Sequence, residues 1–126
     1  CRGVEVVQQR VTAARYLWAK LPMRTAAKQR MHAVLADAAD PAVAAELLAN
    51  ASVVYAYNTM YGALDAKLAP LFARHMSLGA RLIVHRYTPP YRAFADALRV
   101  VAEVPQQVER ARVYLLDGVT VLEKVK

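Results

Sequence analysis

The segment Ser52-Val53-Val54-Tyr55-Ala56-Tyr57-Asn58-Thr59-Met60-Tyr61-Gly62 decides how the rest of the chain is interpreted. Its run of apolar and aromatic residues predicts a central parallel strand that is covered on both faces. The run reaches a polar residue at Asn58, and open α/β sheets bind their ligands at the carboxyl ends of their strands. Because Asn is also a common strand terminator, the segment predicts the fold and makes Asn58 only a candidate.

Strand and helix patterns alternate on both sides of this segment. Further strands are expected at residues 1–6, 31–35, 81–85 and 97–104. Helices are expected at residues 7–21, 41–50 and 63–76. Pro22 ends the first helix, and Asp40 with Pro41 forms an N-cap for the second. Pro70 predicts either a kink in the third helix or a start near Ala69.

The end of the chain carries a hairpin signal. Asp117-Gly118 separates two strand-like runs at residues 112–116 and 119–125. The element order is therefore β-α-β-α-β-α-β followed by antiparallel strands at one edge. Such alternation predicts a mostly parallel sheet with helices on both faces, built as a single domain over residues 1–126.

The composition is strongly basic. The chain has 17 Lys and Arg against 10 Asp and Glu, a net charge of +7. This balance favours anionic surroundings, such as RNA, an acidic protein or the interior of a ribonucleoprotein. An ordinary basic surface, as in many organellar proteins, explains it equally well. No apolar run approaches the ~20 residues that cross a bilayer.

Three polar candidates lie at the ends of three successive predicted strands. Glu5 could accept both hydroxyls of a ribose, or be an exposed acid that the dipole of the next helix favours. Asp37 could accept a hydrogen bond from an adenine amino group, or be a turn residue. Asn58, with Tyr57, could orient an amine nucleophile. Each signal is weak alone, and their shared position at strand ends is informative.

Other chemistries find little support in the sequence. The three histidines lie on different predicted elements, so no zinc site is expected. No nucleophile elbow, phosphate-binding loop or zinc knuckle is present. Several tyrosines near strand ends could wall a pocket or stack on a base, and some of them belong to the core: Tyr55, Tyr57, Tyr61, Tyr87 and Tyr91.

Four segments resemble the class I methyltransferases that use S-adenosylmethionine, and most closely the Dot1 family of protein-lysine methyltransferases. Residues 1–5 (CRGVE) are similar to that family's G-[IV]-E, and residues 35–38 (LADA) to its L-x-x-G-D-F. Residues 50–61 resemble its strand ending N-N-x-x-[FY], and residues 71–84 its F-x-x-M-x-x-G-x-R-[IL]-V. The resemblance covers nearly the whole chain and implies a Rossmann-like three-layer sandwich.

The resemblance also assigns roles. It implies that Glu5 holds the ribose of S-adenosylmethionine, that Asp37 and Ala38 bind its adenine, and that Asn58 with Tyr57 lines the methyl-transfer site. Three substitutions depart from the family: Ala36 replaces a Gly, Ala38 an aromatic residue and Tyr57 the first Asn of the pair.

The family's first strand and glycine-rich loop have no counterpart in these residues. We expect that strand upstream, or from another chain, since a sheet lacking it exposes unpaired backbone groups. By hypothesis, these 126 residues alone do not bind S-adenosylmethionine. Micromolar binding measured by calorimetry would contradict the hypothesis.

The sequence leads to two main functional expectations. The first is the carboxyl-terminal part of an S-adenosylmethionine-dependent methyltransferase domain that methylates a protein lysine. The alternative is an inactive methyltransferase-like subunit of a large basic or RNA-containing assembly such as a mitochondrial ribosome. A generic nucleotide-binding domain is a third reading. A Dot1-type enzyme implies the nucleus, whereas the basic composition, and a likeness to mitochondrial lysine methyltransferases, suits the mitochondrion.

Overall fold

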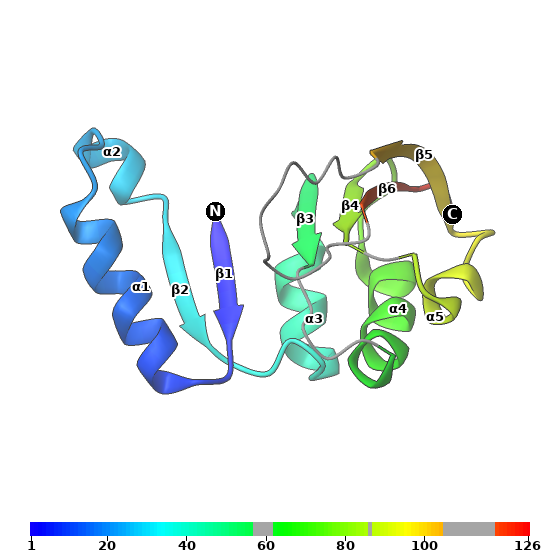
Figure 1. Cartoon of the computed structure of the whole chain (residues 1–126), viewed down its shortest axis with the longest axis horizontal. Helices are drawn as coiled ribbons and strands as arrows, with labels where there is room; N and C mark the ends of the chain where they lie inside the picture. The colour runs from blue at the N-terminus through cyan, green and yellow to red at the C-terminus, as the bar shows by residue number, and fades with distance from the viewer. Residues whose placement is uncertain (57–61, 86, 105–117) are drawn as a thin grey trace, which may run out of the picture. The chain divides into compact units, whose positions relative to one another are not determined.

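A computed structural model describes residues 1–56, 62–85, 87–104 and 118–126 (Figure 1). The chain divides into two compact units, Cys1–Val43 and Ala44–Lys126. The described strands pair in two separate sheets, one within each unit, and not in the one continuous sheet that was expected. The single domain over residues 1–126 stays a prediction, and each unit is described by itself below.

The first unit is a β-α-β arrangement with a short additional helix. Strands β1 and β2 are parallel and pair with each other, and α1 forms the connection between them, as a parallel pair requires. Val11 on α1 is only 1% exposed, and the Arg15 guanidinium donates to the carbonyl oxygen of Ala33 in β2 at 2.8 Å. The elements are β1 (Arg2–Glu5), α1 (Gln8–Lys20), α2 (Thr25–Lys28) and β2 (His32–Leu35). The two predicted strands and the helix ending before Pro22 are thus confirmed.

The second unit contains a four-stranded sheet in the order β3-β4-β6-β5. Strands β3 and β4 are parallel, whereas β6 runs antiparallel to both β4 and β5. The elements are β3 (Val53–Ala56), α4 (Ala63–His75), β4 (Arg81–Val84), α5 (Pro89–Arg92), β5 (Leu98–Val104) and β6 (Val119–Lys124). The helix α3 (Pro41–Leu48) precedes them. The last strand is confirmed, but it lies inside the sheet, and residues 112–116 are outside the described residues.

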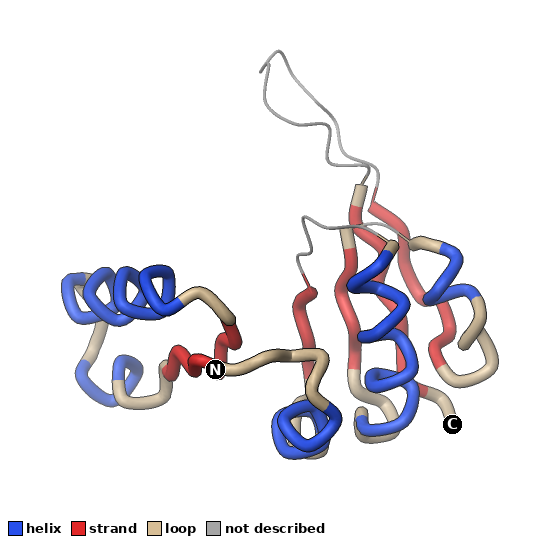
Figure 2. The backbone as a smooth tube through the Cα atoms, turned by 90° about the horizontal axis from the view of Figure 1, so that it is seen from below, coloured by secondary structure: helices blue, strands red, loops and turns tan. Residues whose placement is uncertain are grey.

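The four-stranded sheet is covered by helices on one face. Helices α3, α4 and α5 lie on the same side of it (Figure 2), and the strand residues facing them are buried: Leu82, Val84, Leu98 and Leu122. On β3, Val53 is 59% exposed and Tyr55 is 60% exposed. The prediction that β3 is covered on both faces is therefore wrong for this unit, since the face that carries Val53 and Tyr55 is open. Among the described residues of the unit, β3 pairs with β4 alone.

Capping and proline residues in the sequence account for the boundaries of α3 and bear on the start of α4. The Asp40 carboxylate accepts N–H bonds from Ala42 at 2.8 Å and Val43 at 3.2 Å, which confirms the predicted N-cap of α3. Helix α4 begins at Ala63 and contains Pro70, so the alternative start near Ala69 is wrong. Within the ranges described, no helix is both long and apolar enough to cross a membrane.

The sequence did not predict α5. The pair Pro89-Pro90 starts this one-turn helix. Proline is tolerated in the first turn of a helix, where a backbone N–H would have no intrahelical acceptor. Helix α5 places Tyr91, which is 1% exposed, against Phe72 of α4, and the two rings stack at 6.4 Å.

Candidate functional site

Two of the predicted site residues lie at the carboxyl edge of the β1–β2 sheet. The register pairs Glu5 with Leu35, so Asp37 stands two residues beyond the position opposite Glu5. The N–H of Ala36 donates to the carbonyl oxygen of Glu5 at 3.2 Å, which fixes this edge of the pair. Parallel strands that start together also end at the same edge of the sheet. The structure therefore brings Glu5 and Asp37 to one edge, as predicted.

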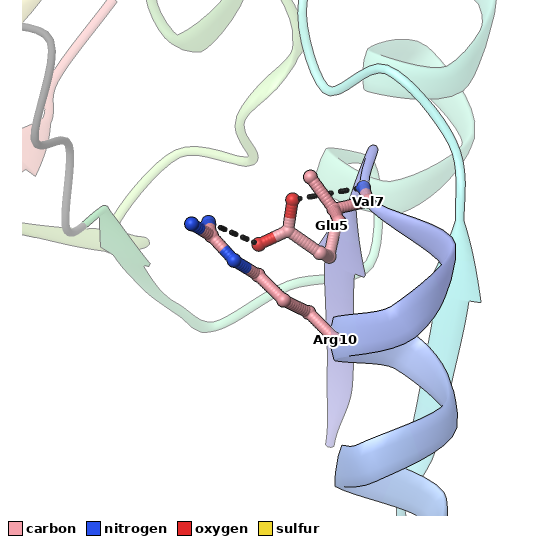
Figure 3. A network of polar contacts seen from close by, with 3 residues as sticks. All are labelled: Glu5, Val7 and Arg10. Atoms are coloured by element: carbon pink, nitrogen blue, oxygen red, sulfur yellow. Dashed lines mark hydrogen bonds and ion pairs between the residues drawn. The ribbon is translucent and has the colours of Figure 1, made fainter.

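The Glu5 carboxylate is held at both oxygens (Figure 3). Oε1 accepts the N–H of Val7 at 3.0 Å, just ahead of α1, and Oε2 accepts from the Arg10 guanidinium at 3.2 Å. The Val7 N–H, and after it the Arg10 side chain, lower the pKa of Glu5 below its ordinary value of 4.5. Glu5 is therefore an ionised acceptor at neutral pH, with 32% of its side chain exposed.

This arrangement predicts an acid-dependent loss of stability. A carboxyl whose folded-state pKa is lowered stabilises the fold fully above the unfolded-state pKa, and that contribution is lost as pH falls through the folded-state pKa. We expect the difference in unfolding free energy between the wild-type protein and Glu5→Gln to be constant above pH 5.5 and to shrink below about pH 4.5. Urea unfolding from pH 3 to 7 measures it, with the exposed Glu103→Gln as control. A constant difference at all pH values would contradict the assignment.

Asp37 occupies a turn. Its Oδ1 accepts the N–H of Ala39 at 2.8 Å, and its carbonyl oxygen accepts the N–H of Asp40 at 3.1 Å. Asp37 is thus a turn residue that leads into the N-cap of α3, which was one of the two interpretations of Asp37 from the sequence. The carboxylate is exposed, and Oδ2 has no hydrogen-bond donor among the residues the structure describes. One oxygen therefore remains available to a ligand, beside an exposed Ala38 that offers no ring.

A second polar group lies at the carboxyl edge of β3 and β4. The Tyr55 hydroxyl and Nε2 of His85 are hydrogen-bonded at 2.5 Å, and the two rings meet edge to face with centroids 5.4 Å apart. His85 is 8% exposed, so Tyr55 is the accessible member of the pair. Tyr57 and Asn58, the predicted catalytic residues, fall outside the described residues and stay predictions.

A buried carboxylate joins the segments that follow these two strands. Asp65 on α4 is 3% exposed and accepts hydrogen bonds from the Thr88 hydroxyl at 3.0 Å and the Tyr91 hydroxyl at 3.1 Å. The first turn of α4 is thereby tied to the start of α5. No group of three or more candidate metal ligands occurs in the described part of the chain.

Sequence reasoning missed three of these contributors. Arg10 lies one turn into the helix after Glu5, which places it within reach of that carboxylate. His85 follows β4 at the same alternation parity as Ile83, the residue paired with Tyr55. Parity along the strands puts Tyr55 and His85 on one face only once the register of β3 and β4 is known. Asp65 could not have been found this way, because its partners depend on the unpredicted helix α5.

Comparison with known proteins places the fold. No protein-family model matches the sequence, and no curated protein matches it. Among solved structures, the chain is similar to the N-methyltransferase NodS from Bradyrhizobium japonicum WM9, at 9% identity and a TM-score of 0.64, covering 99% of this chain and 73% of that one. It is also similar to a candidate methylase from Haemophilus influenzae, at 9% identity and a TM-score of 0.62, covering 99% and 72%. The chain therefore has an α/β, Rossmann-like fold similar to the folds of these two proteins.

Proposed function

We propose that this chain is part of an S-adenosylmethionine-dependent methyltransferase that acts on the side-chain amine of a protein lysine. The observation that carries the proposal is the pair of carboxylates, Glu5 and Asp37, at one edge of a parallel strand pair in a methyltransferase fold. The lysine acceptor rests on the sequence resemblance of residues 50–61 and 71–84 to the Dot1 family.

The residues at this edge fit the nucleoside part of the cofactor. Each oxygen of Glu5 has one hydrogen-bond donor from Val7 or Arg10, and a carboxylate oxygen can accept two. Glu5 therefore keeps capacity for two ribose hydroxyls while the fold holds it in place. Oδ2 of Asp37 can accept from an amino group of the base.

In this proposal the chain mainly binds and orients. S-adenosylmethionine supplies an electrophilic methyl group on a sulfonium sulfur. Glu5 and Asp37 hold the nucleoside, which positions the reacting end without touching it, and positioning of this kind lowers the barrier by removing orientational freedom. Asn58 and Tyr57 would line the transfer site. Removing a proton from the acceptor amine requires a further group.

The direct test uses the natural full-length protein. We expect it to bind S-adenosylmethionine in equilibrium dialysis and to transfer a radiolabelled methyl group from it to lysine in proteins of its own cell lysate. Mass spectrometry of the labelled peptides identifies the modified side chain. No binding would contradict the proposal, and methylation of another side chain would contradict its lysine part.

A second candidate is an inactive structural subunit of an RNA-containing assembly. The net charge of +7 and the replacements at Ala36 and Ala38 favour it. It predicts that the full-length protein binds no S-adenosylmethionine and sediments with ribonucleoprotein particles until ribonuclease is added. Sedimentation as a free protein with cofactor bound would exclude it.

A further inference from the structure

We infer that Tyr55 and His85 form the pair that takes the proton from the acceptor amine, an inference that rests on the proposed function. An alkylammonium group has an ordinary pKa of about 10.4, so it carries its proton and has no free lone pair at neutral pH. An enzyme that methylates such a group must therefore remove that proton.

The strand register brings the pair together. Tyr55 pairs with Ile83 across the parallel strands β3 and β4, and His85 stands two residues beyond Ile83. Side chains two residues apart on a strand point to the same face, so Tyr55 and His85 share one face of the sheet. Both lie towards the carboxyl edge, where open α/β sheets bind their ligands. The hydroxyl and Nε2 meet at 2.5 Å.

The two residues differ in solvent exposure, and we assign each a different role in the proton transfer. Tyr55 is 60% exposed, whereas His85 is 8% exposed. The Tyr55 side chain is therefore the member of the pair that a substrate amine can approach, while the imidazole is buried. The phenol serves as the group that contacts the amine, and the imidazole serves as the general base that accepts the phenolic proton.

The proton transfer balances without any additional reactant. With the Tyr55 hydroxyl donating to an unprotonated Nε2, one N–H bond of the ammonium breaks and its proton joins the phenol oxygen. The original phenolic proton passes to Nε2. The amine gains its lone pair, Tyr55 remains a neutral phenol, and the positive charge moves to His85. Loss of water around the ammonium favours this step, because desolvation lowers the pKa of an amine.

A role limited to packing makes a different prediction. The edge-to-face contact of the rings survives when Tyr55 becomes phenylalanine, whereas the hydroxyl that carries the proton is lost. Because Tyr55 is largely exposed, Tyr55→Phe leaves the buried core unchanged. This variant therefore separates proton transfer from packing, and His85→Asn provides a second test.

The experiment measures methyl transfer by the full-length protein from S-adenosylmethionine to poly-L-lysine. We expect Tyr55→Phe and His85→Asn each to lower kcat by about 100-fold or more, the usual size of an acid–base contribution, with the cofactor Kd unchanged. Matched controls are Tyr16→Phe, at a tyrosine that is 64% exposed in the first unit, and His75→Asn at the end of α4. Both controls should react at the wild-type rate.

A second measurement needs no activity. In nitrogen-15 spectra of the cofactor-free protein, Tyr55→Phe should shift the Nε2 resonance of His85 and leave that of His75 in place. Unchanged His85 resonances, or wild-type kcat in both variants, would contradict the role of Tyr55 and His85 in proton transfer. Either result would leave the proposed function standing. Absence of methyl transfer from the wild-type protein would overturn the proposed function itself, and the pair with it.

Discussion

Replacing Asp65 by alanine is expected to lower the free energy of unfolding by about 2–5 kcal/mol, because each buried polar group left without its partner costs about 1–3 kcal/mol. Asp65 accepts hydrogen bonds from Thr88 and Tyr91, and Tyr91 is 1% exposed. The Tyr91 hydroxyl loses this acceptor inside the packing between α4 and α5. The expected loss is therefore close to the upper limit for a single polar substitution.

Three variants make this measurement specific. Tyr91→Phe removes one donor and keeps the ring stacked on Phe72, so it should cost only about 1 kcal/mol. Asp65→Asn keeps an acceptor oxygen and should lose less than Asp65→Ala. Asp96→Ala, at an exposed position, should change the free energy by less than about 0.5 kcal/mol. Urea denaturation of all four variants tests the set, and a loss under 1 kcal/mol for Asp65→Ala would contradict a bracing role.

The same network explains why Asp65 matters to the candidate site although it touches no proposed ligand. Asp65 ties the start of α4, which follows β3, to the start of α5, which follows β4. The Tyr55–His85 pair lies at the carboxyl ends of these same two strands. Weakening the network should therefore disturb the pair as well as stability, so the Asp65 variants also serve as a check on the site.

The fold was predictable where local pattern determines structure. Alternation of strands with apolar helix faces identified β1, α1, β2 and β4, and the Asp40-Pro41 cap placed the start of α3. The pattern failed at β3, where an unbroken apolar run predicted cover on both faces. Such a run reports hydrophobicity and not which neighbours are present, so it cannot show that Val53 and Tyr55 face outward.

The candidate site divides in the same way. Glu5 and Asp37 were predictable, because a residue at or just beyond the end of a strand must lie at the edge where that strand ends. The bond between Tyr55 and His85 depends on the register of two strands, and the bonds of Asp65 depend on how α5 packs. Register and packing are tertiary properties, and no residue pattern within either segment specifies them.

Replacing Glu5 by alanine in the full-length protein is expected to weaken S-adenosylmethionine binding by about 5- to 150-fold, which corresponds to the loss of about 1–3 kcal/mol of hydrogen bonding to the ribose. The carboxylate is held by Val7 and Arg10 before any ligand binds, so little orientational freedom remains to be lost on binding. Isothermal titration calorimetry of both proteins measures the ratio.

Arg10→Ala distinguishes ribose binding from the local role of Glu5 ahead of α1. The Arg10 variant removes the ion pair at Oε2 but leaves the carboxylate and its bond to Val7. If Glu5 binds the ribose, Arg10→Ala should change the cofactor affinity far less than Glu5→Ala does. Equal losses of cofactor affinity in the two variants would show that the Glu5–Arg10 ion pair affects binding only by stabilising the fold. Wild-type affinity in Glu5→Ala would remove Glu5 from the site and leave it as the acid that accepts a backbone N–H at the start of a helix.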